Sequence, residues 1–523
     1  MKRRLMSRAW AEWRVYFTPV CVLVGVWLVG ADQGWPRVDT GLYAGLSRWA
    51  YAGDLAQWWF LTGPEEDYFN KPPLVFWGHG LAMWVWRAVD GEPTMWVLRV
   101  PTLIMAVVAL VVFTDVVRRV SGARAALTAG IVLATTLEFF RFTKNISLDM
   151  WVCGCVLVGV WAAVRAGRGM LNPASREASE RAPNVWAWIM VGGVAFGAGL
   201  MVKPMLALVP LVLLGVWVGW VRGWRRGLFE TIAMLVVALA VALPWHVSMA
   251  LRYDDFLATY IGGQALDRIT TDAHGSQPPY YYLTELVTWY WPWLVPAAIG
   301  MVWGMRRLAS RSGVARVPLA ARPPVPDTDT HPTGGHATSD THLQRFLGDR
   351  AALALALVWT IGWLAALSIS TDKATRYAIS MYAGLAIIAA LWMTKGAPVW
   401  VRRGGGRAAT VWLGPVALAG GIAAGIVVAV VPVRVHPPMH EGWAALVERI
   451  DAEPEMLDEL VIAGDWRTAG GTLMWRYGAW PGRVEEDGPT DGMVLDTDGV
   501  VDASTGRVRL ERHGFRLIET TMR

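Results

Sequence analysis

The chain has few of the residues that mark a disulfide-stapled, metal-binding or nucleotide-using protein. Its 523 residues include three cysteines, all inside apolar runs, so we expect them to pack rather than to form disulfides or bind metal. A G-x-x-x-x-G-K-[ST] loop is absent from the sequence, so direct use of ATP is not expected. Charged residues make up only 17% of the chain, and we expect no nucleic-acid partner.

What the chain has in abundance is apolar sequence. It is 54% hydrophobic with a mean hydropathy of +0.35, and a helix of about 20 apolar residues crosses a bilayer. We therefore predict an integral membrane protein with about eleven transmembrane helices. The predicted spans are 15–31, 97–117, 123–141, 150–166, 185–202, 204–221, 229–248, 291–305, 351–368, 377–394 and 409–432.

Arginine indicates the orientation of these spans, because Lys and Arg accumulate in cytoplasmic loops. Arginine clusters lie before 15–31 and in alternate loops after it, which places the N-terminus inside and the C-terminus outside. A cleaved secretory signal at 15–31 is disfavoured by its long preface and by the lack of a clear cleavage site. The apolar stretch 74–89 is short and rich in Trp, so we expect an interfacial helix; the alternative is a twelfth span that inverts the downstream topology.

The predicted fold is an all-α polytopic membrane protein with a small extracytoplasmic α+β domain. Residues 1–432 form the bundle, with a first outer loop at 32–96. A cytoplasmic loop at 307–350 is polar and loosely ordered, and its histidines are better explained by solvation than by metal binding. Residues 433–523 carry 17 acidic and 10 basic residues and mix helical with alternating patterns, which indicates a soluble α+β domain.

Lysine is scarce, and its placement is the strongest functional signal. Of 48 basic residues only six are lysine, and four of the six fall in outer segments, against the positive-inside rule: Lys71, Lys144, Lys203 and Lys373. Charges at the mouth of a helical bundle are costly, so they indicate a functional partner. We expect an anionic, lipid-linked substrate at the outer membrane surface.

Other outer residues fit the same expectation. Further polar candidates are His274, Arg376 and Tyr377. A polyprenyl-phosphate sugar would keep its tail in lipid, while cations at helix ends bind its phosphate and stabilise the charge that grows as the glycosidic bond breaks. A carboxylate must then accept the acceptor hydroxyl's proton, and Asp39 and Asp149 are the outer acids nearest to span ends.

Structural explanations compete with this interpretation. Asp149 begins a span and could simply cap a helix N-terminus. Lys203-Pro204 could be a structural turn, and Arg376 could be an interfacial anchor. Several cations and two acids on one face are harder to explain in this way together than singly.

Motifs along residues 15–395 resemble a known family. They are Asp39-Thr-Gly-Leu-Tyr43, Asn70-Lys71-Pro72-Pro73, Arg99-Val-Pro101, Lys203-Pro204, Leu243-Pro244-Trp245, His274-Gly, Pro279-Tyr-Tyr-Tyr282 and Ser368-Ile-Ser370 with Lys373 and Tyr377. In order and side they resemble the GT-C glycosyltransferases, most of all the aminoarabinose transferases that modify lipid A and more distantly the protein O-mannosyltransferases. Two positions depart from the family pattern: Thr40 follows Asp39, and Leu42 precedes Tyr43.

The resemblance implies roles for individual residues. Asp39 would be the catalytic carboxylate, Asp149 the second acidic position, and Lys71 a donor-phosphate ligand, with Tyr43 in the same substrate-binding set. It implies a GT-C bundle in a bacterial inner membrane and inverting transfer from a polyprenyl (undecaprenyl) phosphate sugar to a glycolipid or protein, at the outer face.

A required metal is not expected, although Asp39 and Asp149 could share a divalent cation. A lipid-linked-sugar flippase and a non-catalytic membrane scaffold stay open as alternatives. The sequence does not define the sugar, the acceptor or the oligomeric state.

Overall fold

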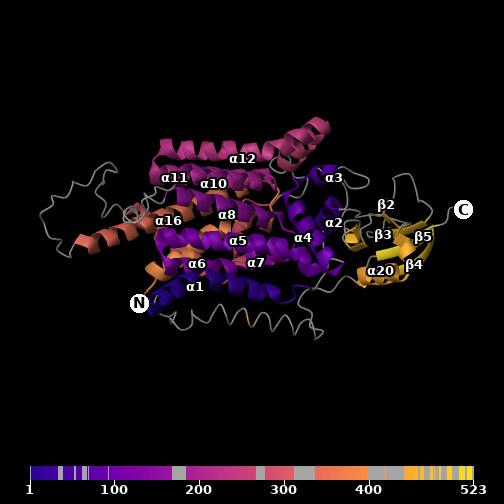
Figure 1. Cartoon of the computed structure of the whole chain (residues 1–523), viewed down its shortest axis with the longest axis horizontal. Coiled ribbons are helices and arrows are strands. Elements are labelled where there is room, and N and C mark those ends of the chain that lie inside the picture. Colours follow the sequence, from indigo (N-terminus) through magenta and orange to yellow (C-terminus); the bar gives the residue numbers. More distant parts are fainter. Residues whose placement is uncertain are drawn as a thin grey trace.

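The computed structural model of the chain is mostly helical (Figure 1). It describes residues 2–32, 39–51, 55–61, 68, 70–91, 94–167, 184–266, 277–310, 336–398, 419, 441–457, 460–463, 472–474, 476–477, 482–483, 492–496, 506–512 and 515–520. Only the backbone is described for residues 2–12, 39, 55–56, 90, 205, 264–266, 336–347, 441–444, 463, 482–483, 492–493, 496, 506–512, 515–516 and 519–520.

The bundle consists of long helices that run along the long axis of the molecule, side by side in Figure 1. Its main helices are α1 (Lys2–Leu28), α5 (Met95–Ser121), α6 (Ala123–Ala134), α8 (Leu148–Ala166), α10 (Val185–Leu200), α11 (Pro204–Arg222), α12 (Trp224–Arg252), α15 (Leu294–Ala309), α16 (His336–Ile369) and α17 (Met381–Leu391), the last continued by a wide turn η5 (Trp392–Gly396). Shorter elements are α7 (Leu137–Arg141), η1 (Phe142–Lys144), η3 (Ala258–Leu266), α14 (Tyr281–Trp289) and η4 (Thr375–Ala378).

Each predicted span before residue 400 falls on one of these helices or on a consecutive pair, and 409–432 lies outside the described residues. By length and composition, four described helices can cross a membrane on their own: Met95–Ser121, Leu148–Ala166, Trp224–Arg252 and Gly348–Ile369. A fifth is possible if 123–144, bent by 59° between its two halves, counts as one span. The described helices therefore support a polytopic membrane fold.

Three helices of the first outer loop cover one end of the bundle, opposite the N-terminus (Figure 1). They are α2 (Asp39–Ala50), α3 (Leu55–Trp59) and α4 (Leu74–Asp90). The Leu74 amide donates to the Met201 carbonyl just past α10, and His79 Nδ1 lies 2.9 Å from the Leu98 carbonyl in the first turn of α5. These two contacts of α4 fall near the ends of α10 and α5, and its interfacial placement stays a prediction.

Stacked tryptophans hold this outer layer together. The Trp58 and Trp77 rings stack at 4.8 Å, and the Trp77 indole donates to the Trp58 carbonyl at 2.6 Å. Trp59 donates to the Ser248 hydroxyl at 2.7 Å, which joins α3 to α12. Aromatic pairs contribute about 0.5–1.5 kcal/mol each beyond their buried area, and these partly buried rings stabilise the layer in this way.

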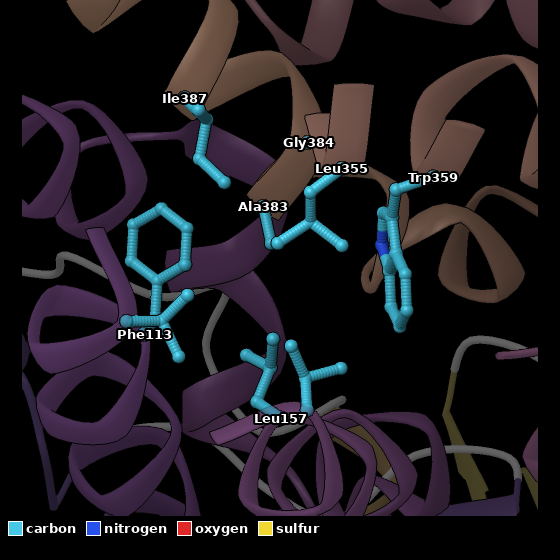
Figure 2. Close-up of a pocket in the computed structure, with 9 residues that line it drawn as sticks. Phe113, Leu157, Leu355, Trp359, Ala383, Gly384 and Ile387 are labelled. Carbon is cyan, nitrogen blue, oxygen red and sulfur yellow. The ribbon is translucent and has the colours of Figure 1, made fainter. Parts of the chain in front are cut away.

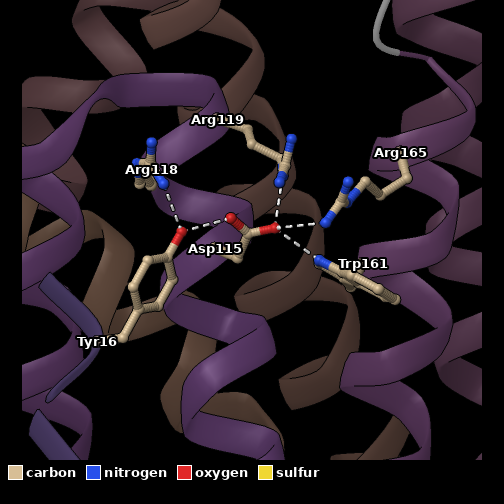
Figure 3. Close-up of polar contacts among 6 residues, drawn as sticks. All are labelled: Tyr16, Asp115, Arg118, Arg119, Trp161 and Arg165. Carbon is tan, nitrogen blue, oxygen red and sulfur yellow. Dashed lines mark hydrogen bonds and ion pairs between the residues drawn. The ribbon is translucent and has the colours of Figure 1, made fainter. Parts of the chain in front are cut away.

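The opposite end of the bundle is held by acids that pair with the arginines predicted to be inside. Asp115 accepts hydrogen bonds from Tyr16 (2.6 Å), Arg119 (2.5 Å) and Trp161 (2.7 Å), with Arg165 at 3.7 Å (Figure 3). One carboxylate thus joins α1, α5 and α8.

Two more acids repeat this arrangement at the same end. Glu230 binds the fully buried Arg222 at 2.5 Å and Arg226 at 2.8 Å, and Asp349 binds Lys395. Arg222 packs so tightly on Gly167 that a Cβ there would lie 1.9 Å from the guanidinium. Removing one partner of a buried ion pair costs about 3–5 kcal/mol, so these acids fix the helix ends as well as balance charge.

Residues 441–520, the C-terminal tail, form a separate small core. The helix α20 (Glu441–Ala452) and the short η6 (Pro454–Leu457) precede a mixed sheet of β1 (Leu460–Ala463), β2 (Gly482–Arg483), β3 (Gly492–Asp496), β4 (Gly506–Arg512) and β5 (Phe515–Thr520). The strand order is β2-β1-β3-β5-β4, with β1 parallel to its neighbours and β5 antiparallel to its own. Leu446 and Ile450 of α20 bury against Leu460, Ile462 and Leu517, next to α2–α4 in Figure 1.

Candidate functional site

The candidate site is built around Asp149 at the outer end of α8. The helix begins after Ser147, whose hydroxyl accepts the Met150 amide at 3.2 Å and so serves as the N-cap. Asp149 lies in the first turn with only 6% of its side chain exposed. The N-cap residue is therefore Ser147 and not Asp149. Asp149 still lies where the helix dipole favours an acid, so its functional role stays a prediction.

Two cations flank this carboxylate. Lys203 Nζ lies 2.8 Å from Asp149 Oδ1, and Arg376 Nε lies 3.8 Å from Oδ2. The Lys203 ammonium also sits 4.5 Å from the centre of the Tyr377 ring, and the Arg376 guanidinium lies 5.5 Å from that ring. The structure thus brings together four predicted site residues from three separate segments, which we call the outer cluster: Asp149, Lys203, Arg376 and Tyr377.

Local backbone structure places Lys203 in this cluster. The helix α10 ends at Leu200, and the Lys203 amide donates back to the Gly199 carbonyl at 2.9 Å. Pro204 then begins α11, in the first-turn position where its missing N–H costs nothing. The Lys203-Pro204 turn is therefore structural and also aims the ammonium at α8.

The loop that carries Arg376 and Tyr377 is fixed by Lys373. Its ammonium donates to the carbonyls of Gln277 (3.0 Å) and Ser370, and the Gln277 amide donates to the Thr371 carbonyl at 3.3 Å. Burial lowers the pKa of Lys373 from its ordinary value, although the nearby Asp372 raises it. Lys373 thus borders the outer cluster and binds backbone oxygens; a direct role with substrate stays a prediction.

Glu138 is an acid of this region that the sequence reasoning missed. It is fully buried in the first turn of α7, directly after the 59° bend, and its carboxylate lies 3.4 Å from Arg141 and interacts with the Thr375 hydroxyl. Thr375 is the first residue of η4, which carries Arg376. The available signal was an acid inside an apolar run that ends at the outer face.

The remaining predicted residues have different surroundings. Lys71 is half-buried just before α4, and Tyr43 of α2 packs edge-on to Phe76 with ring centres 5.5 Å apart. The Asp39 backbone begins α2, but its side chain and all of His274 lie outside the described residues.

Another lysine that the sequence places on the outer side donates its hydrogen bond to a backbone carbonyl. Lys144 donates to the Val29 carbonyl at 2.5 Å, and Arg99 donates to those of Gly30 and Ala31, so both cations cap the C-terminal end of α1. Lys144 thus has a structural role that its placement in the sequence did not reveal.

The described pocket in the bundle has a different character. It lies between α5, α8, α16 and α17, as Figure 2 shows, and its lining is Phe113, Val116, Leu157, Val160, Leu355, Trp359, Ala383, Gly384 and Ile387. The Trp359 indole is already bonded to the Ser380 carbonyl at 2.7 Å. Such an apolar space offers no polar group to bind a phosphate or a sugar.

The outer cluster can bind an anion and hold a carboxylate beside it. Lys203 carries three ammonium N–H donors and Arg376 a planar fork of five guanidinium N–H donors, and both kinds of group suit a phosphate. Among the described residues, no three His, Cys, Asp or Glu side chains gather as a metal site would require.

Comparisons with known proteins show what the chain is similar to. Residues 70–247 match the family model described as dolichyl-phosphate-mannose-protein mannosyltransferase. Relatives include undecaprenyl phosphate-alpha-4-amino-4-deoxy-L-arabinose arabinosyl transferases of Erwinia tasmaniensis (26% identical over 248 residues) and Pseudomonas aeruginosa (28% over 251 residues). Each match covers 46% of this chain, and the chain spans 41% and 42% of these relatives.

Solved structures resemble the chain over nearly its whole length. The crystal structure of ArnT from Cupriavidus metallidurans bound to undecaprenyl phosphate has a TM-score of 0.66 at 16% identity, covering 97% of this chain and 98% of that one. The apo oligosaccharyltransferase of Archaeoglobus fulgidus has a TM-score of 0.54 at 14% identity, covering 90% and 64%. These comparisons confirm the predicted resemblance to GT-C polyprenyl-phosphate-sugar transferases, and the structures establish a shared polytopic fold.

Proposed function

From its resemblance to the GT-C transferases, we propose that this chain is a membrane glycosyltransferase. It would move a sugar from a polyprenyl phosphate to an envelope acceptor. The Asp149–Lys203–Arg376 cluster carries the proposal, because it sets a buried acid between two cations at the bundle end opposite the arginine-rich end. The relatives' names support undecaprenyl phosphate as carrier and an amino sugar as cargo. A lipid A-type glycolipid is the favoured acceptor, and a protein is the alternative.

In the proposed reaction the donor phosphate binds Lys203 and Arg376 while its tail stays in lipid. An acceptor hydroxyl oxygen attacks the anomeric carbon, the bond from that carbon to the phosphate oxygen breaks, and the electron pair stays on the phosphate. The two cations stabilise the growing negative charge, which matters most in a site that excludes water. The configuration at the anomeric carbon inverts in this single displacement.

The two acids take different parts in this proposal. Asp149 holds Lys203 and Arg376 in place from behind, since both of its oxygens already face cations. Asp39, the first residue of α2, accepts the acceptor's proton. The chain's own cations supply the positive charge at the phosphate, so the proposed reaction requires no metal.

We place the outer cluster and the C-terminal tail on the outer face of a bacterial inner membrane, with the N-terminus inside. The arginine distribution supports this orientation, since Arg118, Arg119 and Arg165 gather at the end opposite the outer cluster. Cysteine accessibility to a membrane-impermeant reagent, at an introduced site in the tail, would test it.

The test of the function is transfer of radiolabel from undecaprenyl-phosphate sugars to envelope material by purified protein, with and without chelator. We expect transfer by wild type that chelator leaves unchanged, and loss of transfer in Asp39→Asn and Lys203→Met. Arg87→Met, at an exposed position of α4, is the matched control and should keep full activity. Donor binding without transfer from any donor would favour a flippase or a scaffold.

A further inference from the structure

The C-terminal tail touches the bundle's outer layer through a buried arginine. Arg48 lies in the last turn of α2 and donates from Nη1 to the Arg476 carbonyl of the tail at 3.1 Å. Only 5% of Arg48 is exposed, although α2 lies outside the bundle proper. Burying a guanidinium is costly unless it is hydrogen-bonded, so losing this contact would be unfavourable, and the contact stabilises the association of α2 with the tail.

On its other side α2 is pressed against α4. A Cβ on Gly80 would lie 2.3 Å from the Ser47 carbonyl oxygen, so the two backbones meet at the residue before Arg48. Tyr51 follows α2 and donates to the Trp77 carbonyl of α4 at 3.2 Å. The helix α2 is therefore held between α4 and the tail.

The Arg476 carbonyl is held in place by contacts within the tail. The next residue, Tyr477, donates to Asp451 of α20 at 3.0 Å and lies 3.4 Å from the Val447 carbonyl. Its ring also packs against the tail core around Leu446 and Ile450. The carbonyl that receives Arg48 is thus fixed to the tail's own core.

We propose that the tail is a positioning module for the active site, and that Arg48 is the positioning residue through which it acts. Asp39 begins α2 and Arg48 lies in its last turn, so any shift of α2 also moves the proposed base. This inference rests on the proposed function and deepens it. The tail has no direct part in the chemistry; it fixes the angle and depth at which α2 presents Asp39.

The test compares Arg48→Ala, Arg48→Lys and the control Arg449→Ala in the full chain. Arg449 is a tail arginine that bonds only its helix neighbour Glu453 among the contacts the structure describes. For Arg48→Ala we expect kcat to fall about 10- to 100-fold, as for a small misplacement of a reacting group, with an unchanged donor KM. Arg48→Lys keeps a donor for the carbonyl and should recover part of the loss, while Arg449→Ala should match wild type.

Hydrogen exchange gives a readout that does not depend on activity. In Arg48→Ala we expect faster exchange in α2, with no change in the bundle helix α8. Tyr477→Phe, which loosens the same carbonyl from the tail side, should show the same pattern more weakly and covers the case in which Arg48→Ala fails to fold.

Unchanged kcat and unchanged α2 exchange in Arg48→Ala would overturn the positioning role. Absence of transfer in wild type would instead refute the proposed function. Hydrogen exchange in α2 of Arg48→Ala would then decide separately whether the contact between Arg48 and Arg476 holds α2.

Discussion

The ion pair of the outer cluster makes a quantitative prediction about stability that is independent of activity. Lys203→Met leaves the Asp149 carboxylate, 6% exposed, with only Arg376 at 3.8 Å among its described ion-pair partners. Removing one partner of a buried pair costs about 3–5 kcal/mol, but partial exposure of Lys203 and the remaining arginine reduce this to about 2 kcal/mol. Asp149→Asn should cost a similar amount, because it leaves two cations without their acid.

The double variant, with both Lys203→Met and Asp149→Asn, should lose less unfolding free energy than the sum of the two single losses. With both charges gone neither is left buried and unpaired, so we expect a coupling energy of about 1–2 kcal/mol. The assay is reversible unfolding of all four proteins in mixed detergent micelles, read by tryptophan fluorescence.

A second cycle on Arg449 and Glu453 gives the matched control, since this pair sits at 3.1 Å but is 34% and 52% exposed. Its coupling should be about 0.3–0.5 kcal/mol, as for exposed helix pairs. Additive effects at Asp149 and Lys203, within about 0.5 kcal/mol, would refute the claim that the two side chains form one buried unit.

Four further predictions concern other parts of the molecule. Asp115→Asn should lower the unfolding free energy by about 3–5 kcal/mol in the same assay while donor binding stays intact, because it breaks a buried charge network far from the outer cluster. Gly80→Ala should lower the melting temperature, since overpacking typically costs about 1–3 kcal/mol. A Cβ on Gly262 would meet nothing within 4 Å, so the Gly262→Ala control should leave the melting temperature nearly unchanged. Glu138→Gln should retain more transfer than Glu138→Ala, because glutamine can still bond the η4 segment; equal loss in kinetic assays would contradict this. Burial and Asp451 raise the pKa of Tyr477 from 10.0 to about 12. The unfolded tail therefore loses this proton at a lower pH than the folded tail, so tail stability is intact below pH 10 and falls between pH 10 and about 12. Circular dichroism should detect this fall in wild type, and the fall should be absent in Tyr477→Phe.

Much of the bundle could be predicted because membrane helices are encoded locally. Apolar runs of the right length mark the spans, and the arginines mark one end of them, so the ends at which Asp149 and Lys203 lie followed directly. The pairing of Asp149 with Lys203 did not, since it depends on how the ends of α8 and α10 meet. From the sequence, Asp149 and Lys203 could be placed at the same end of the bundle, but not within hydrogen-bonding distance of each other.

The misses have a common physical cause. Glu138 sits in an apolar run, and its importance depends on a bend and on Thr375, more than two hundred residues away in sequence. Lys144 was counted as a substrate-facing cation, yet it binds a carbonyl at the end of α1. Lys373 likewise binds carbonyls at an irregular turn, and its direct role with substrate stays a prediction. Backbone oxygens carry no sequence signature, so cations that satisfy them look the same as cations reserved for a ligand.

The clamp between Arg48 and Arg476 also orders events in time. A ribosome delivers the first outer loop early, whereas the carbonyl that receives Arg48 lies 428 residues later in the chain. Every span between them is inserted before the two can meet. Under the positioning role proposed for Arg48, a nascent chain therefore reaches full activity only after its final segment has been exported and folded. A chain cut short between residues 433 and 475 would keep every predicted span, yet its first outer helix would lack the contact with Arg476.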